Sequence, residues 1–185
     1  KTFKIDKILP LIEYGHIDYG ENKVQEALEK WTEVKKKNSK IRLHMVGKLQ
    51  TNKVKVAVRI FDYIHSVDSE KLARKIADEQ NKINKKIKIF LQVNIGDESQ
   101  KSGINQNELG KLVSFSKEIG LTVVGLMCIP PLNFNPEVFF VEMNKLNKDL
   151  GFEELSMGMS SDYLIAAKNF STYVRVGSSI FGQRS

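Results

Sequence analysis

The chain has 185 residues, of which 41% are hydrophobic and 28% are charged. This length is typical of one globular domain with its own core, since domains commonly run to about 150 residues. No stretch approaches the roughly 18 consecutive apolar residues of a membrane span, and the start lacks the apolar core of a secretory signal. A single cysteine, Cys128, excludes an internal disulfide and a cysteine-based metal cluster, as a reducing cytoplasm would permit.

The net charge of +7 raises the question of a nucleic-acid surface. The lysines are spread over 35–37, 82–88 and 145–148, on the polar faces of segments with helical spacing. No arginine-rich or aromatic strip accompanies them. Solvated helix faces are therefore the favoured interpretation, with nucleic-acid binding as the alternative.

Seven short runs rich in β-branched residues predict strands, and they alternate along the chain with longer segments of helical spacing. The run at 87–91 is apolar on both faces, which is typical of a strand inside a parallel sheet that is covered on both sides. The predicted strands are residues 17–19, 41–46, 63–66, 87–94, 122–127, 155–157 and 173–176.

Between the strands, apolar residues three and four positions apart predict helices, as in the face shared by Val24, Ala27 and Trp31. A helix is also predicted over 5–13, although Pro10 cannot donate a hydrogen bond in a helix interior. Regular alternation of strand and helix leaves two α/β folds, a (β/α)8 barrel and an open doubly wound sheet. No Gly-x-Gly-x-x-Gly follows an early strand, which argues against a dinucleotide-binding open sheet.

Two loops of glycine and serine follow the last two predicted strands, where (β/α)8 barrels commonly bind phosphate. Glycine lets backbone N–H groups approach an anion, and serine adds hydroxyl donors. Each loop alone would also fit an ordinary turn or helix N-cap, but the pair favours a phosphate ligand and a barrel. The residues are Ser156, Gly158 and Ser160 in the first loop and Gly177, Ser178 and Ser179 in the second.

Arg175 lies between Val174 and Val176 on the last predicted strand. Strand alternation places its side chain either inside the barrel or against the helices, and a buried guanidinium without a partner is costly. This favours a position at the barrel mouth facing a ligand. Pairing with a nearby carboxylate is the alternative.

Four motifs that follow Lys1 in this order resemble those of the pyridoxal phosphate homeostasis protein family. The resemblance covers 1–184 and implies one α/β domain over 1–185, a (β/α)8 TIM-type barrel like the N-terminal domain of alanine racemase. In that family a strand precedes the lysine, so we expect the chain to be truncated at its start and to lack the first strand of the barrel. The motifs are GENKVQE at 20–26, HMVGKLQTNK at 44–53, LSMGMSS at 155–161 and YVRVGSS at 173–179.

The resemblance implies that Lys1 holds pyridoxal 5′-phosphate (PLP) as a Schiff base and that Arg175 faces the pyridine nitrogen. A guanidinium cannot accept a proton, so the ring nitrogen stays unprotonated and the cofactor is a weak electron sink. Asn22 is implied to lie near the cofactor, although an N-cap role would explain it equally well. The full set of expected cofactor-binding residues is Lys1, Asn22, His44, Ser156, Met157, Gly158, Arg175, Gly177 and Ser178, with no catalytic or metal-binding residue.

The function implied by the resemblance is PLP binding in intracellular PLP homeostasis without robust turnover, by a cytoplasmic monomer. Its partners would be PLP and PLP-dependent apo-enzymes. A single-domain amino acid racemase is the first alternative, and a basic barrel that binds nucleic acid is the second. Solvent reaches a one-domain site freely, which favours exchange of the cofactor over protected carbanion chemistry.

Overall fold

The computed structural model describes residues 3–98 and 100–182, and in them strands and helices alternate. All seven predicted strands are present, with ends that differ from the prediction by at most two residues. The strands are β1 (Asp18–Glu21), β2 (Arg42–Met45), β3 (Tyr63–Val67), β4 (Lys88–Val93), β5 (Thr122–Cys128), β6 (Glu154–Met159) and β7 (Tyr173–Arg175). The helices are α1 (Ile5–Glu13), α2 (Val24–Lys37), α3 (Val54–Ile60), α4 (Glu70–Lys82), α5 (Gln106–Glu118), α6 (Pro136–Asp149), α7 (Tyr163–Lys168) and α8 (Ser178–Phe181), with a 3-10 turn η1 (Thr51–Lys53) before α3.

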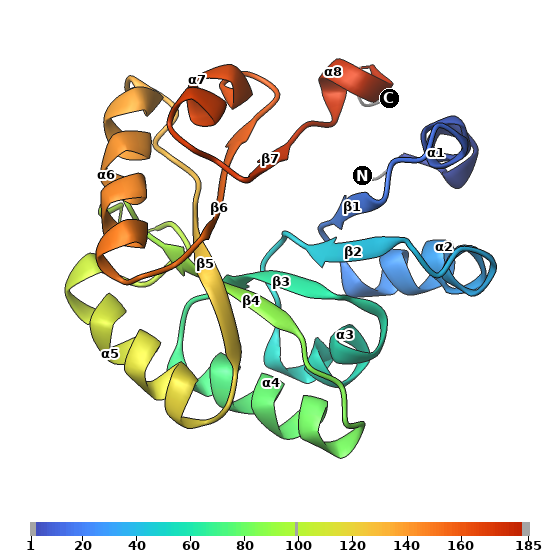
Figure 1. The fold of residues 1–185 in the computed structure, drawn as a ribbon, viewed down its shortest axis with the longest axis horizontal. Helices are drawn as coiled ribbons and strands as arrows, with labels where there is room; N and C mark the ends of the chain where they lie inside the picture. Colours follow the sequence, from blue (N-terminus) through green and yellow to red (C-terminus); the bar gives the residue numbers. More distant parts are fainter. Residues whose placement is uncertain (1–2, 99, 183–185) are drawn as a thin grey trace.

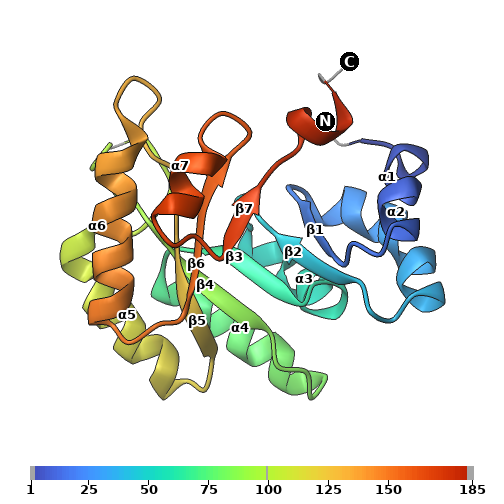
Figure 2. The same ribbon diagram turned by 45° about the horizontal axis from the view of Figure 1, so that its top comes forward.

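The strands form one sheet in chain order from β1 to β7, and every neighbouring pair is parallel. Figure 1 shows this sheet curving into a nearly closed barrel with the helices outside it, which confirms the barrel form of the α/β prediction. The edge strands β1 and β7 flank the opening that remains, and α1 and α8 lie beside it (Figure 2). The described residues contain no strand that closes the opening, so the missing first strand stays a prediction.

The ends of the described chain meet at this opening, where the rings of Phe3 and Phe181 are 4.9 Å apart. Because all strands are parallel, their carboxyl ends gather at one end of the barrel, which we call the mouth. The loops that leave the mouth lead into the helices. Loops after β6 and β7 therefore lie side by side there.

Alternation along each strand divides the side chains into two layers. Ile89 and Leu91 of β4 pack in the main hydrophobic core between sheet and helices. Phe90, between them in sequence, belongs to a small cluster inside the barrel with Tyr63 and Met127. The barrel interior is thus partly aromatic, and polar side chains occupy much of the remainder.

Helix α1 forms over the predicted range even though Pro10 lies inside it. The proline removes one backbone hydrogen bond, yet the apolar side chains of Ile5, Ile8 and Ile12 pack against the main core. Tertiary packing of an amphipathic face offsets the lost bond, as it does for most helices in proteins.

Gly158 fixes the contact between β6 and α7. Its φ of +91° is in the left-handed region, and an added Cβ would lie 2.5 Å from Cβ of Ala166 on α7. A side chain would therefore strain the backbone and push the helix away from the strand. Gly151, in the turn after α6, has a similar φ of +72° but open space around it.

We expect Gly158→Ala to lower the free energy of unfolding by about 2–4 kcal/mol, because left-handed strain and overpacking add. Gly151→Ala should cost only the backbone strain, about 1–2 kcal/mol. Denaturant unfolding of both variants measures the difference. Equal losses would show that α7 does not pack against Gly158 as described.

Candidate functional site

The two Gly/Ser loops lie in contact at the mouth. The backbone N–H of Gly177 donates a hydrogen bond to Oγ of Ser160 at 3.2 Å, which joins the loop after β6 to the segment after β7. The N–H of Met159 donates to the Asp162 carboxylate at 2.6 Å and closes the first loop. Helix α8 begins at Ser178, and its first backbone hydrogen bonds are donated by Ile180 and Phe181 to the Gly177 carbonyl. The N–H groups of Ser178 and Ser179 precede these bonds and can donate to an acceptor.

Arg175 ends β7 inside the barrel, next to these loops. Its Nη1 donates to Oγ of Ser156 at 3.0 Å and to the Ser156 carbonyl at 3.3 Å, and its Nη2 donates to the Cys128 carbonyl at 2.9 Å. Burial lowers the pKa of Arg175 from its ordinary value. These acceptors are neutral, and no carboxylate within the described chain forms a salt bridge with this guanidinium.

Ser156 is linked to two histidines that lie deeper in the barrel. Its Oγ is 2.8 Å from Nδ1 of His65, and Nε2 of His65 is 2.9 Å from Nδ1 of His44. All three residues are buried, with exposed fractions between 0% and 4%. His44, predicted to lie near the cofactor, therefore reaches Arg175 through His65 and Ser156.

The chain of contacts ends at an ion pair on the first residues of β1 and β2. Nε2 of His44 is 2.9 Å from Oδ1 of Asp18, and Arg42 donates to both oxygens of this carboxylate at 2.7 and 2.6 Å. Burial alone would raise the pKa of Asp18, but the hydrogen bonds from His44 and Arg42 lower it to about 2. The carboxylate is thus ionised at neutral pH.

Aromatic rings enclose the two imidazoles. The His44 ring stacks on Tyr63 and the His65 ring stacks on Phe90, each with ring centroids 4.3 Å apart, and Tyr173 meets the His65 ring edge-on. Burial, as the largest cause, lowers the pKa of His65 well below its ordinary value. His65 is therefore neutral at physiological pH.

Three further predicted site residues are Asn22, Met157 and Lys1. Asn22 is exposed at the end of β1, and the cap of α2 is Lys23 without a side-chain hydrogen bond, so the N-cap alternative for Asn22 is wrong. The side chain of Met157 packs in the main core on the helix side of the sheet, and Ser171 takes up both its N–H and its carbonyl. Lys1 lies outside the described residues.

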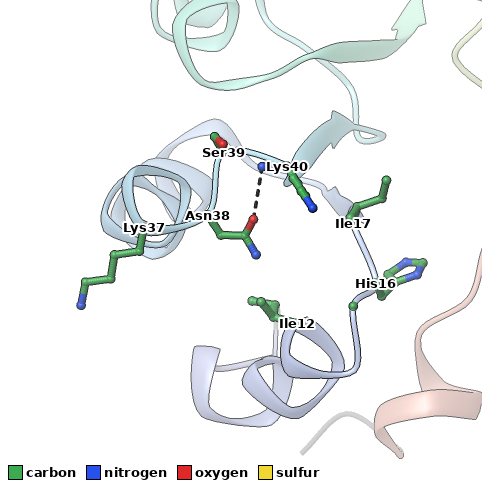
Figure 3. Close-up of a pocket in the computed structure, with 8 residues that line it drawn as sticks. Ile12, His16, Ile17, Lys37, Asn38, Ser39 and Lys40 are labelled. Atoms are coloured by element: carbon green, nitrogen blue, oxygen red, sulfur yellow. Dashed lines mark hydrogen bonds between the residues drawn. The ribbon is translucent and has the colours of Figure 1, made fainter.

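Two surface pockets lie away from Arg175. The pocket in Figure 3, about 420 Å³, is lined by residues that include Ile12, His16 and Asn38, next to the start of β1 and thus at the end of the barrel opposite the mouth. A second pocket of about 480 Å³ lies beside the carboxyl ends of β3 and β4 and includes Asp68 and Lys101. Neither includes a predicted cofactor-binding residue.

Sequence patterns alone missed His65 and Asp18. The signal for His65 was its position two residues after Tyr63 on one strand, which places both on the same face. Its contact with Ser156 joins positions 91 residues apart, which no spacing rule reveals.

Among the described residues, no group of three or more His, Cys, Asp or Glu side chains could hold a metal ion. None of the described helices is long and apolar enough to cross a membrane.

The chain is similar to several known proteins. The family model described as "Alanine racemase, N-terminal domain" matches residues 2–185. The pyridoxal phosphate homeostasis protein of Aquifex aeolicus (strain VF5) is 38% identical, and the match covers 100% of this chain and 84% of that protein. The protein of the same name from Escherichia coli (strain K12) is 31% identical over 100% of this chain and 83% of that protein.

Solved structures agree with these matches. PipY of Synechococcus elongatus PCC7942 has been solved without PLP and with PLP bound, with TM-scores of 0.92 and 0.86 and 32% identity over 98% of this chain and 89% of that chain. The alanine racemase of Clostridium difficile 630 has a TM-score of 0.76 at 12% identity, over 97% of this chain and 48% of that chain, and shows likeness of fold alone. The chain therefore belongs to the pyridoxal phosphate homeostasis protein family and is built from the alanine racemase N-terminal domain.

Proposed function

We propose that the protein binds pyridoxal 5′-phosphate at the mouth of the barrel and acts in intracellular PLP homeostasis. The observation that carries this proposal is the position of Arg175. Its cation is held among neutral oxygens and beside two loops that offer N–H and hydroxyl donors. The relatives named pyridoxal phosphate homeostasis proteins, and PipY solved with PLP bound, support the choice of cofactor.

The residues present fit this cofactor. A guanidinium has five N–H groups, and the three described hydrogen bonds leave donors of Arg175 for the pyridine nitrogen of a ligand. Backbone N–H groups around Ser178 and the hydroxyls of both loops suit a phosphate. Gly158 and Gly177 belong to these loops, and Lys1 is the proposed covalent attachment point.

We further propose that the protein stores or delivers PLP and does not turn over a substrate robustly. Bound PLP supplies an aldehyde for a reversible bond to an amine and a ring that can accept electrons. Arg175 can donate a hydrogen bond to the ring but cannot yield the protonated pyridine that a carboxylate partner sustains. The proposed recipients are PLP-dependent apo-enzymes, and the proposed state is a monomer in the cytoplasm.

A nucleic-acid function has less support. Lysines of the first two basic stretches are engaged with carboxylates of the protein itself, which reduces the charge available to phosphates. Lys35 pairs with Asp62, Lys82 with Glu79 and Lys88 with Glu154.

Adding PLP to the purified protein should produce a visible absorbance band of a lysine adduct, and borohydride reduction followed by peptide mass mapping should place the adduct on Lys1. Lys1→Ala should abolish this adduct, while Lys4→Ala, which changes an exposed lysine three residues away, should leave it unchanged. A reduced adduct elsewhere would refute the assignment of Lys1. Absence of any band in the unaltered protein would refute PLP binding.

Pyridoxal without its phosphate should bind at least about tenfold more weakly than PLP. Each hydrogen bond to a charged group contributes about 1.5–3 kcal/mol, and a tenfold change in affinity corresponds to about 1.4 kcal/mol. Absorbance titrations of the unaltered protein with both compounds measure the ratio. Equal affinities would show that the two Gly/Ser loops do not hold the phosphate.

A further inference from the structure

The hydrogen atoms in the buried chain of contacts can be placed from its two ends. At one end, the Asp18 carboxylate is ionised and can only accept hydrogen bonds. Nε2 of His44, 2.9 Å from Oδ1 of Asp18, must therefore carry a hydrogen. At the other end, the guanidinium of Arg175 can only donate, so Oγ of Ser156 accepts from it.

The two imidazoles between these ends decide where the hydroxyl hydrogen of Ser156 points. His65 is neutral and carries one hydrogen. With one hydrogen on each imidazole, that of His44 is on Nε2, and its Nδ1 accepts from Nε2 of His65 across 2.9 Å. Nδ1 of His65 is then bare and accepts from the Ser156 hydroxyl at 2.8 Å. Each atom thereby has one consistent role, from Arg175 as donor to Asp18 as acceptor.

We propose that His44 and His65 are positioning residues for the mouth. In this arrangement the hydroxyl hydrogen of Ser156 points toward His65, inside the barrel, and Oγ of Ser156 presents a lone pair to Arg175. The guanidinium is then held against Ser156 and the Cys128 carbonyl, with its remaining donors available to a ligand. The direction of the hydrogen bonds follows from these contacts with one hydrogen on each imidazole, whereas their effect on PLP rests on the function proposed above.

The packing supports this assignment. Both rings stack on an aromatic neighbour, His44 on Tyr63 and His65 on Phe90. Turning either ring over would place carbon atoms where its two nitrogens now make their contacts. Arg42 donates to both oxygens of Asp18 and keeps the acceptor end in place. The orientation of Ser156 is therefore set by groups that lie up to the opposite end of the barrel.

The direction is tested on the full chain without cofactor, by proton–nitrogen correlation NMR of the histidine rings at neutral pH. The chain has three histidines, and His16→Gln identifies the signals of the other two. We expect both His44 and His65 to carry hydrogen on Nε2 and to have a bare Nδ1. A hydrogen on Nδ1 of His65 would overturn the proposal, because Ser156 would then be the acceptor.

The acceptor end provides a matched pair of variants. Asp18→Asn can donate as well as accept, so we expect a population of His65 with hydrogen on Nδ1 to appear. Asp62→Asn removes a similarly half-buried carboxylate that contacts Lys35 and should leave the histidine signals unchanged. Unchanged His65 signals in folded Asp18→Asn would overturn the role of Asp18 in setting the direction.

The effect on the ligand is tested by PLP titration of two variants at one position. His65→Gln keeps one donor and one acceptor and should bind PLP within about threefold of the unaltered protein. His65→Leu has neither and should bind at least about tenfold more weakly. If the unaltered protein binds PLP and folded His65→Leu binds it equally well, the positioning role is wrong. If the unaltered protein binds no PLP, the proposed function fails, and the NMR measurement still decides the direction.

Discussion

The arrangement of residues at the mouth depends on one constraint, which is that a cation inside the barrel must be solvated. Arg175 extends inward from the last residue of β7, where water cannot fully surround it, so protein atoms must take the place of water. Strands β5 and β6 supply the acceptors, through the Cys128 carbonyl and both oxygens of Ser156. The guanidinium thereby ties together three adjacent strands at the end where the two Gly/Ser loops begin.

A second constraint follows from the first, because every polar group beneath Arg175 also needs a partner. The two histidines satisfy Ser156, and the pair of Asp18 and Arg42 satisfies the histidines. This network is possible because the main hydrophobic core lies outside the sheet, against the helices. The interior of the barrel is then free to hold polar groups between aromatic rings.

Much of the fold could be predicted from the sequence, because a parallel sheet imposes a local pattern of strands that are apolar on both faces. The mouth was also predictable in part, since Arg175 and the two loops are each marked by residue type and by position after a strand. Met157 was expected near the cofactor because of its place in the motif. Strand alternation from Ser156 instead places its side chain toward the helices, where it packs in the main core. The links through His65 and Asp18 could not be predicted, because their partners are distant in sequence and are set by strand register.

The two partners of Arg175 differ in how they constrain evolution of the chain. At position 128 the acceptor is a main-chain carbonyl, which every amino acid provides, so substitution there is limited by volume in the core and not by the guanidinium. At position 156 the side-chain oxygen is used as well, and in the proposed direction this single atom accepts from a cation and donates to an imidazole, which a hydroxyl can do and an amide oxygen cannot. Within this family, substitutions should therefore be tolerated at position 128 and restricted at position 156.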